Sequence, residues 1–207
     1  MPYEPLPIGD HVPAPVRALI ESVVDGALKE IRFIMEVNPP PDVGPKGHLQ
    51  LSLAKLLLSA IDGAAQLLVP GVMGDGGRFK RFLMDNFPWD RVELGGESAV
   101  RELASEFMWD SARCALIHRY GLHTKGDLRK FGRLFTINDE QLTALERGQQ
   151  PGKGFFENFP DRTVVWIEPL YWCLRQAIVK ALDTSDKANA VEAYIKSGIW
   201  DRKAKSR

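Results

Sequence analysis

Cysteine is scarce in this chain: Cys114 and Cys173 are the only two among 207 residues. They form no CxxC pair, so the sequence argues against a structural zinc site and favours a reducing, cytosolic setting. Three of the four histidines, His11, His48 and His123, lie in or near expected loops, with no acidic neighbours at ligand spacing. We therefore expect no metal and no other cofactor.

The chain also lacks a net charge and a long apolar run. Lys and Arg together number 27, and so do Asp and Glu, so any nucleic-acid binding would need a local basic patch. No apolar run approaches the ~20 residues that span a bilayer. The beginning, "MPYEPLPIGDHVPAPV", has five prolines and no apolar core, unlike a signal peptide. We expect a cytoplasmic protein without a membrane partner.

What is present is a helical pattern. Hydrophobic residues make up 44% of the chain, enough for a sizeable core. Apolar side chains recur at helical spacing in six segments, and Ser185 is the expected N-cap of the last one. The expected helices cover residues 14–37, 48–68, 78–87, 97–120, 168–183 and 185–200.

Two short segments have a different character. "FGRLFTI" (131–137) and "TVVWI" (163–167) are rich in β-branched and aromatic residues, which predicts two strands. The fold class is therefore mainly α: a helical bundle with a small two-stranded β insert, in a single domain. Its expected parts are a Pro-rich arm (1–12), a helical bundle core (13–121), a strand-containing insert (122–167), C-terminal helices (168–200) and a basic tail (201–207).

The second expected helix is apolar around most of its circumference but carries one polar stripe. Lys55, Ser59, Asp62 and Gln66 follow one another at steps of four, three and four. This stripe is either a solvated edge or the wall of a wet cleft. In a cleft, Asp62 would need a cationic partner such as Arg113, with Ser59 beside it as a supporting residue.

The stretch "SARCALIHRYG" (111–121) interrupts the apolar pattern of the fourth expected helix with Arg113, His118 and Tyr120. Arg113 and Tyr120 lie about 20° apart on an ideal helix, whereas His118 lies about 140° from Arg113. Arg113 has the strongest functional claim, because unpaired burial of a charge is costly. His118 and Tyr120 have alternative roles as core side chains near a helix end.

These residues fit the pattern Arg, four residues, His, one residue, Tyr, near the end of a late bundle helix. The pattern resembles the signature of the HEPN superfamily of small helical-bundle proteins. "LLSAIDGAAQLL" (57–68) also looks like the second helix of such bundles. The likeness covers residues 14–121, about half of the chain, and it implies a HEPN-like helical bundle.

The resemblance further implies a metal-independent endoribonuclease in a toxin–antitoxin, phage-defence or RNA-processing system, with RNA as its partner. Arg113, His118 and Tyr120 are the implied catalytic residues. His suits the removal of the 2′-OH proton, and Arg suits the charged phosphorane. The Tyr variant resembles toxins paired with a minimal nucleotidyltransferase antitoxin, which can attach a nucleotide to this Tyr and block the site.

Assembly follows from the same motif. One helix presents Arg113 or His118 squarely to a phosphate, but hardly both, because they diverge around its axis. A two-fold axis beside the fourth helix would bring two copies of the motif together. The resembling family is commonly dimeric across this face. We expect a homodimer in which the two 113–120 segments line one shared groove.

Further basic residues are candidates for phosphate or RNA contacts. "GVMGDGGRFKRF" places four glycines before Arg78, Lys80 and Arg81, where backbone amides and a helix N-terminus attract anions. A plain interhelical loop is the alternative. Arg119, inside the motif, is a fourth candidate.

Two other interpretations of the chain stay open. The first is a HEPN-like bundle without catalysis that serves as an RNA-binding or protein-interaction module. The second is an unrelated helical protein with a small-molecule pocket, lined by Asp62, Arg113, Trp109 and Trp166.

Overall fold

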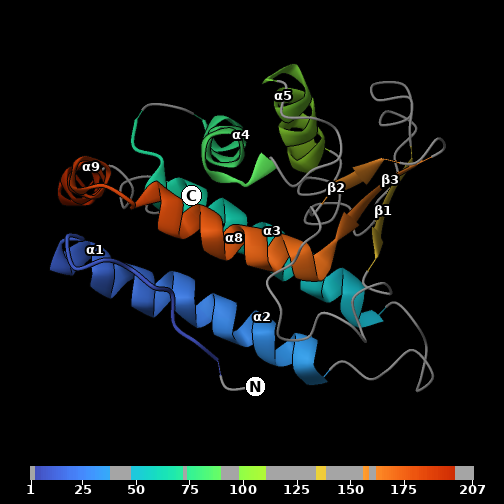
Figure 1. Ribbon diagram of the computed structural model, residues 1–207, viewed down its shortest axis with the longest axis horizontal. Coiled ribbons are helices and arrows are strands. Elements are labelled where there is room, and N and C mark those ends of the chain that lie inside the picture. Colours follow the sequence, from blue (N-terminus) through green and yellow to red (C-terminus); the bar gives the residue numbers. More distant parts are fainter. Residues whose placement is uncertain are drawn as a thin grey trace.

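The computed structural model describes residues 3–37, 48–71, 74–89, 98–110, 134–138, 156–158 and 162–198. The prediction of a mainly α protein is confirmed (Figure 1). In these ranges, no helix is both long and apolar enough to cross a membrane. The elements are α1 (Ala14–Leu19), η1 (Ile20–Asp25), α2 (Gly26–Val37), α3 (His48–Leu68), α4 (Asp75–Asn86), α5 (Ser98–Phe107), β1 (Leu134–Asn138), β2 (Phe156–Asn158), β3 (Arg162–Trp166), α8 (Ile167–Ala181) and α9 (Ser185–Lys196).

α1, η1 and α2 form one continuous helix over the predicted range. Pro15 lies in its first turn, where no intrahelical N–H donor is needed. The middle section, η1, is a π-helical turn. Val16, Ile20, Val24 and Leu28 are all buried at steps of four. In a regular α-helix such a row drifts by about 40° per step, and the wider π turn absorbs part of that drift.

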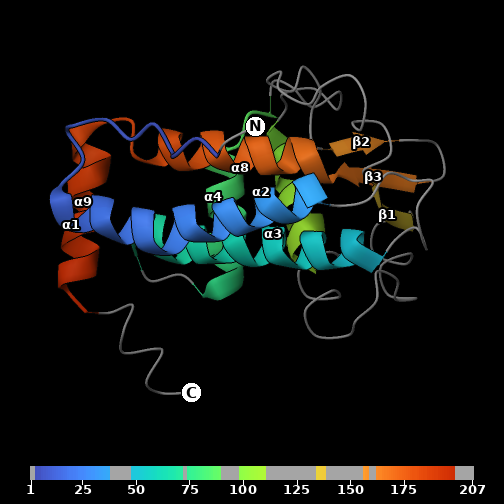
Figure 2. The ribbon, with the colours of Figure 1, turned by 90° about the horizontal axis from the view of Figure 1, so that it is seen from below.

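α3 is the central helix and contacts α2, α4, α8 and α9. Figures 1 and 2 show α2, α3 and α8 lying side by side along the long axis. Leu57, Ile61 and Ala64 of α3 are fully buried, as expected from its apolar pattern. Leu56 differs from the expectation: it is 38% exposed, because its face with Ser52, Ser59 and Gly63 points to solvent.

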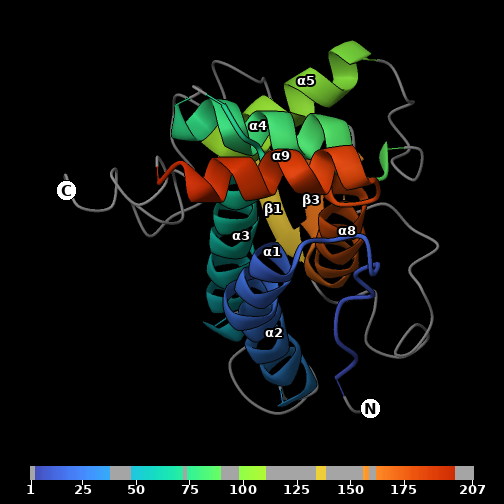
Figure 3. The same cartoon turned by 90° about the vertical axis from the view of Figure 1, so that its left-hand side faces the viewer.

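α8 and α9 close the bundle. α8 follows directly after β3, and α9 lies across one end of the long helices (Figure 3). The cap of α9 lies one residue before the predicted Ser185: the Thr184 side chain accepts a hydrogen bond from the Lys187 backbone N–H at 3.4 Å. Thr184 has the extended backbone that an N-cap requires, whereas Ser185 is already helical.

The predicted two-stranded insert is a three-stranded sheet in the order β1-β3-β2. β1 pairs parallel with β3, with Leu134 opposite Arg162, and β2 pairs antiparallel with β3, with Phe156 opposite Val165. The additional strand, β2, lies between the two predicted strands, in a segment where the sequence predicts no strand. Its three residues are too few to show a period-two pattern. The sheet lies at one end of the helical bundle (Figure 1).

The Pro-rich arm is fastened to the bundle from Tyr3 onward. The Tyr3 hydroxyl donates to Asp25 Oδ1 at 2.5 Å and accepts from Arg175 Nη1 at 3.0 Å. Arg175 Nη2 also donates to the Glu4 and Pro5 carbonyl oxygens, at 2.7 and 3.2 Å. Burial raises the pKa of Tyr3 above its ordinary value, and the hydrogen bond to Asp25 raises it further, although Arg175 lowers it in part. The buried Arg175 of α8 thus holds the start of the arm together with Asp25, which also accepts a hydrogen bond from the Leu6 backbone N–H at 3.1 Å.

Candidate functional site

The predicted catalytic residues Arg113, His118 and Tyr120, together with Arg119, lie outside the described residues. The structure describes the helix that leads toward them: α5 begins at Ser98, and helical conformation continues through Asp110. Over this stretch the predicted helix 97–120 is confirmed. α5 packs against α4, with Ala104, Ser105 and Met108 buried. The roles of the motif residues remain predictions.

The polar stripe of α3 leads to a buried cation. Gln66 Nε2 donates to Asp62 Oδ1 at 3.4 Å, and Arg78 Nη1 donates to Gln66 Oε1 at 2.7 Å. Asp62 and Gln66 are half-buried, whereas Ser59 is exposed. Within the described part of the chain, Asp62 therefore connects to a cation, Arg78, through Gln66. The predicted contact between Asp62 and Arg113 stays a prediction.

Arg78 of α4 is 2% exposed, and it is held by a hydrogen bond to the loop that precedes α4. Its Nη2 donates to the Gly71 carbonyl oxygen at 2.8 Å, and its guanidinium lies 5.4 Å from the centre of the Tyr194 ring. Lys80 pairs with Glu106 at 3.7 Å, and Arg81 pairs with Asp85 at 2.5 Å. The three basic residues therefore point to separate protein partners and do not converge.

Two of the four glycines that precede Arg78, Gly71 before α4 and Gly76 in its first turn, have structural reasons of their own. Gly71 has a φ of +123°, which side-chain-bearing residues rarely adopt. A Cβ atom on Gly76 would come within 2.7 Å of the Trp109 ring. Phosphate binding is therefore not needed to explain these two positions, although binding there stays a prediction.

The tryptophans of the small-molecule interpretation contribute to packing. The Trp109 ring lies 5.2 Å from the Phe79 ring, at 55°. Trp166 is 5% exposed, at the junction of β3 and α8. One cavity lined by described residues lies elsewhere.

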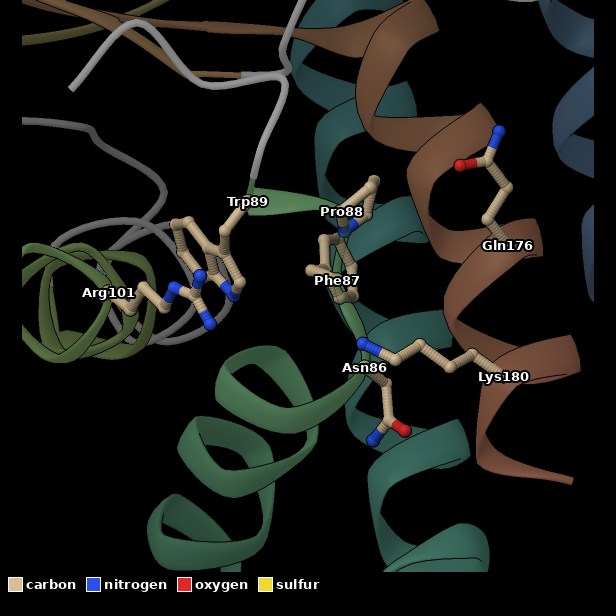
Figure 4. Close-up of a pocket in the computed structure, with 7 residues that line it drawn as sticks. All are labelled: Asn86, Phe87, Pro88, Trp89, Arg101, Gln176 and Lys180. Carbon is tan, nitrogen blue, oxygen red and sulfur yellow. The ribbon is translucent and has the colours of Figure 1, made fainter. Parts of the chain in front are cut away.

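That cavity has a volume of about 320 Å³ and lies between the end of α4, α5 and α8 (Figure 4). Figure 4 shows the Lys180 side chain extending from α8 toward Asn86 and Phe87, and the Arg101 side chain extending from α5 toward Trp89. The lining residues are Asn86, Phe87, Pro88, Trp89, Arg101, Gln176 and Lys180. We call this cavity the α4–α8 pocket.

The apolar wall of the α4–α8 pocket is held rigidly. Trp89 and Phe87 are 3% and 1% exposed, and the indole N–H of Trp89 donates to the Leu83 carbonyl oxygen at 2.8 Å. Phe87 packs edge-on against Phe82, with ring centres 6.0 Å apart. Asn86 Nδ2 donates to the Phe82 carbonyl oxygen at 3.2 Å. The wall is therefore already formed without a ligand.

The charged side chains that line the pocket among the described residues are both positive. Arg101 and Lys180 line it, and no carboxylate of the described residues does. Among the described residues, neither cation has an ion-pair partner, and the Arg101 Nε is buried without a hydrogen-bond partner. A half-buried guanidinium without a counter-charge raises the free energy of the empty pocket and favours an anionic ligand.

Sequence reasoning missed the α4–α8 pocket. Gln176 and Lys180 stand four residues apart on α8, a spacing that places them on one face of the helix, but the sequence does not reveal which element this face meets. Arg101 stands between acidic and apolar residues on α5 and looks like an ordinary solvated charge. Only the packing of α4, α5 and α8 brings the lining residues together.

In the described part of the chain, no group of three or more His, Cys, Asp or Glu side chains is arranged to hold a metal ion. Comparison with family models, with curated proteins and with solved structures finds no match to this chain. The HEPN resemblance therefore rests on the sequence motif and on its position in a mainly helical chain.

Proposed function

We propose that this chain acts on RNA as a HEPN-like, metal-independent endoribonuclease of a toxin–antitoxin or defence system. The Arg–x4–His–x–Tyr motif at Arg113, His118 and Tyr120 carries the proposal. The mainly α fold supports it, as does α5, a helix that begins at Ser98 and runs toward the motif.

In this proposal His118 takes the proton from a ribose 2′-OH, and the resulting alkoxide attacks the adjacent phosphorus. Arg113 stabilises the negative charge of the phosphorane. The bond to the 5′-oxygen breaks, that oxygen gains a proton, and a 2′,3′-cyclic phosphate remains on the other fragment. Tyr120 hydrogen-bonds the phosphate or stacks on a base. A nucleotidyltransferase partner would silence the site by modifying Tyr120.

A homodimer completes the proposed site. Two motifs facing each other across a two-fold axis would let the His118 of one subunit act with the partner's arginine. A mixed dimer of Arg113→Ala and His118→Ala subunits tests this sharing. If the residues pair across subunits, one site of the mixed dimer keeps both groups, and cleavage returns in part. A chain that is monomeric by light scattering contradicts this arrangement.

The first test is incubation of metal-free protein with a labelled pool of RNA in EDTA. Cleavage should persist and leave 2′,3′-cyclic phosphate ends. Arg113→Ala and His118→Ala should each lower the rate by roughly 10²–10⁴-fold, with unchanged circular dichroism. Lys196→Ala, which removes a surface cation of α9, is the matched control. Metal-dependent cleavage overturns the mechanism, and RNA binding without cleavage identifies the non-catalytic module.

A further inference from the structure

We propose that the α4–α8 pocket binds one nucleoside monophosphate unit, either as a free nucleotide or within an RNA strand, through Arg101 and Lys180. The choice of RNA as one source rests on the proposed function. The binding of a phosphate-bearing ligand rests on the pocket alone.

The two cations carry the phosphate assignment. They line the pocket from different helices: Arg101 of α5 lies beside Trp89, and Lys180 of α8 lies beside Asn86 and Phe87 (Figure 4). A phosphate bound in the pocket would be attracted by both charges. Arg offers a planar fork for phosphate oxygens, and Lys offers a mobile point charge. Other cations nearby differ in this respect: Lys80, Arg81 and Lys187 each have a carboxylate partner. Arg78 has no carboxylate partner either, but its guanidinium donates to Gln66 and to the Gly71 carbonyl oxygen. Arg101 and Lys180 have no ion-pair partner among the described residues.

The remaining lining residues suit the nucleoside. Asn86 and Gln176 bring side-chain amides, which can donate to and accept from the edge of a base or the ribose hydroxyls. Phe87, Pro88 and the buried face of Trp89 form an apolar wall. This combination of an apolar wall with a few polar groups is the usual composition of a ligand site.

The volume limits the size of the ligand. About 320 Å³ stands at the lower end of the range of roughly 300–1,000 Å³ found for ligand pockets. One nucleotide unit suits such a cavity better than a dinucleotide or a duplex. In an RNA strand, the neighbouring units would lie outside the pocket, on the side where Lys180 is exposed to solvent.

Calorimetric titration of the full-length chain with UMP, AMP, uridine and inorganic phosphate tests the assignment. A mononucleotide should bind at least roughly tenfold more tightly than uridine, because uridine lacks the charged contacts. It should also bind more tightly than inorganic phosphate, which lacks the base. A short RNA with a 5′-hydroxyl end, titrated into the His118→Ala variant, identifies the source: tight binding of this RNA points to an internal strand unit, and binding of mononucleotides alone points to a free nucleotide.

Arg101→Gln and Lys180→Gln should each weaken mononucleotide binding by roughly tenfold or more and reduce the salt dependence of the affinity by about one charge. Lys29→Gln on α2 and Lys196→Gln on α9 remove exposed cations elsewhere and should leave the affinity unchanged. Lys180 is exposed, so its variant should fold even if the Arg101 variant does not.

Equal binding of uridine and UMP, no mononucleotide binding, or pocket variants that bind like the two controls would overturn the assignment. These results are separable from the fate of the ribonuclease proposal. Mononucleotide binding without RNA cleavage defeats the nuclease and keeps the pocket. Cleavage that needs Arg113 and His118 but is untouched by Arg101→Gln and Lys180→Gln, with no mononucleotide binding, defeats the pocket.

Discussion

α8 presents two faces whose cations have opposite surroundings. On one face, Arg175 makes three hydrogen bonds to the N-terminal arm and lies over the rings of Tyr3, Trp172 and Tyr171, at 5.2, 5.7 and 5.9 Å. On the other face, Lys180 lines the α4–α8 pocket with Arg101 of α5 and has no ion-pair partner among the described residues.

The difference separates a charge that holds the fold from charges that are open to a ligand. Arg175 is 9% exposed, and its hydrogen bonds go to groups of the same chain, so its charge contributes to holding the fold. Arg101 and Lys180, the cations of the pocket, have no comparable set of hydrogen bonds to other described residues. The half-buried Arg101, whose Nε has no hydrogen-bond partner, costs free energy, and such a cost is typical of sites that gain their partner from a ligand. Stability should therefore depend on Arg175 and only slightly on the pocket cations.

The largest effect is expected from Arg175→Ala. It removes every arm contact of this side chain and leaves the Glu4 and Pro5 carbonyl oxygens without that donor, so the free energy of unfolding should fall by about 3 kcal/mol. Urea denaturation measures this change. Lys180→Ala, on the opposite face of the same helix, is the control and should change stability by less than about 0.5 kcal/mol. Equal losses in the two variants would contradict the distinction between the faces.

A smaller effect, dependent on pH, is expected from Tyr3→Phe. At neutral pH it removes the hydrogen bonds with Asp25 and Arg175, at a cost of about 1–2 kcal/mol. Burial raises the pKa of Tyr3 in the folded chain, and burial also raises that of Tyr171. The stability linked to Tyr3 is therefore fully present below the unfolded pKa of about 10 and is lost as the pH rises toward the higher folded value.

Above pH 10 the wild-type chain should thus lose up to about 1.4 kcal/mol more per pH unit than Tyr3→Phe, since the variant has one phenol fewer to keep protonated. Urea denaturation of both proteins at a series of pH values measures the slope. Parallel curves would mean that the Tyr3 phenol ionises as freely in the folded chain as in the unfolded one.

The smallest effect on stability is expected from Arg101→Met. The side chain keeps its apolar volume and loses a charge whose Nε is buried without a hydrogen-bond partner. Replacing such a group by an apolar one is near neutral, so the change should lie within about 1 kcal/mol of zero, in either direction. Thermal denaturation measures it. A loss as large as that of Arg175→Ala would show that the pocket cation belongs to the fold.

The helices could be predicted from the sequence because their signals are local. The apolar rows of α2 and α3 and the proline-rich break after Val37 suffice to locate both helices. β2 could not be predicted, since a three-residue strand exists only through its pairing with β3. The hydrogen bonds from Asp62 through Gln66 to Arg78 could not be predicted, because Arg78 is brought to Gln66 by the packing of α4 against α3. The predicted contact of Asp62 with Arg113 stays a prediction.

The α4–α8 pocket and the contacts of the N-terminal arm could not be predicted either, because they join residues that are far apart in the sequence. Arg175 and Tyr3 are 172 residues apart, and Arg101 and Lys180 are 79 apart, so nothing in the local pattern connects the members of either pair. The proline content predicted an extended arm, but it did not predict that Arg175 of α8 binds this arm. The motif at 113–120, in contrast, is a local pattern and could be noticed without any structure.

The π turn at Ile20–Asp25 divides the first helix into two α-helical parts, α1 and α2, that are rotated relative to each other about the helix axis. Val16 of α1 and Leu28 and Ile31 of α2 are all buried, and the π turn sets the rotation of α1 about the helix axis relative to α2. The turn also contains Asp25, which accepts the hydrogen bond from Tyr3. Removing one residue from the turn would make the helix more regular. It would also rotate α1 by about 100° relative to α2 and carry the arm away from Arg175. A regular α-helix over this segment would therefore be incompatible with the observed packing of the arm. A redesign or transplant of this helix must keep residues 14–37 together, with the π turn.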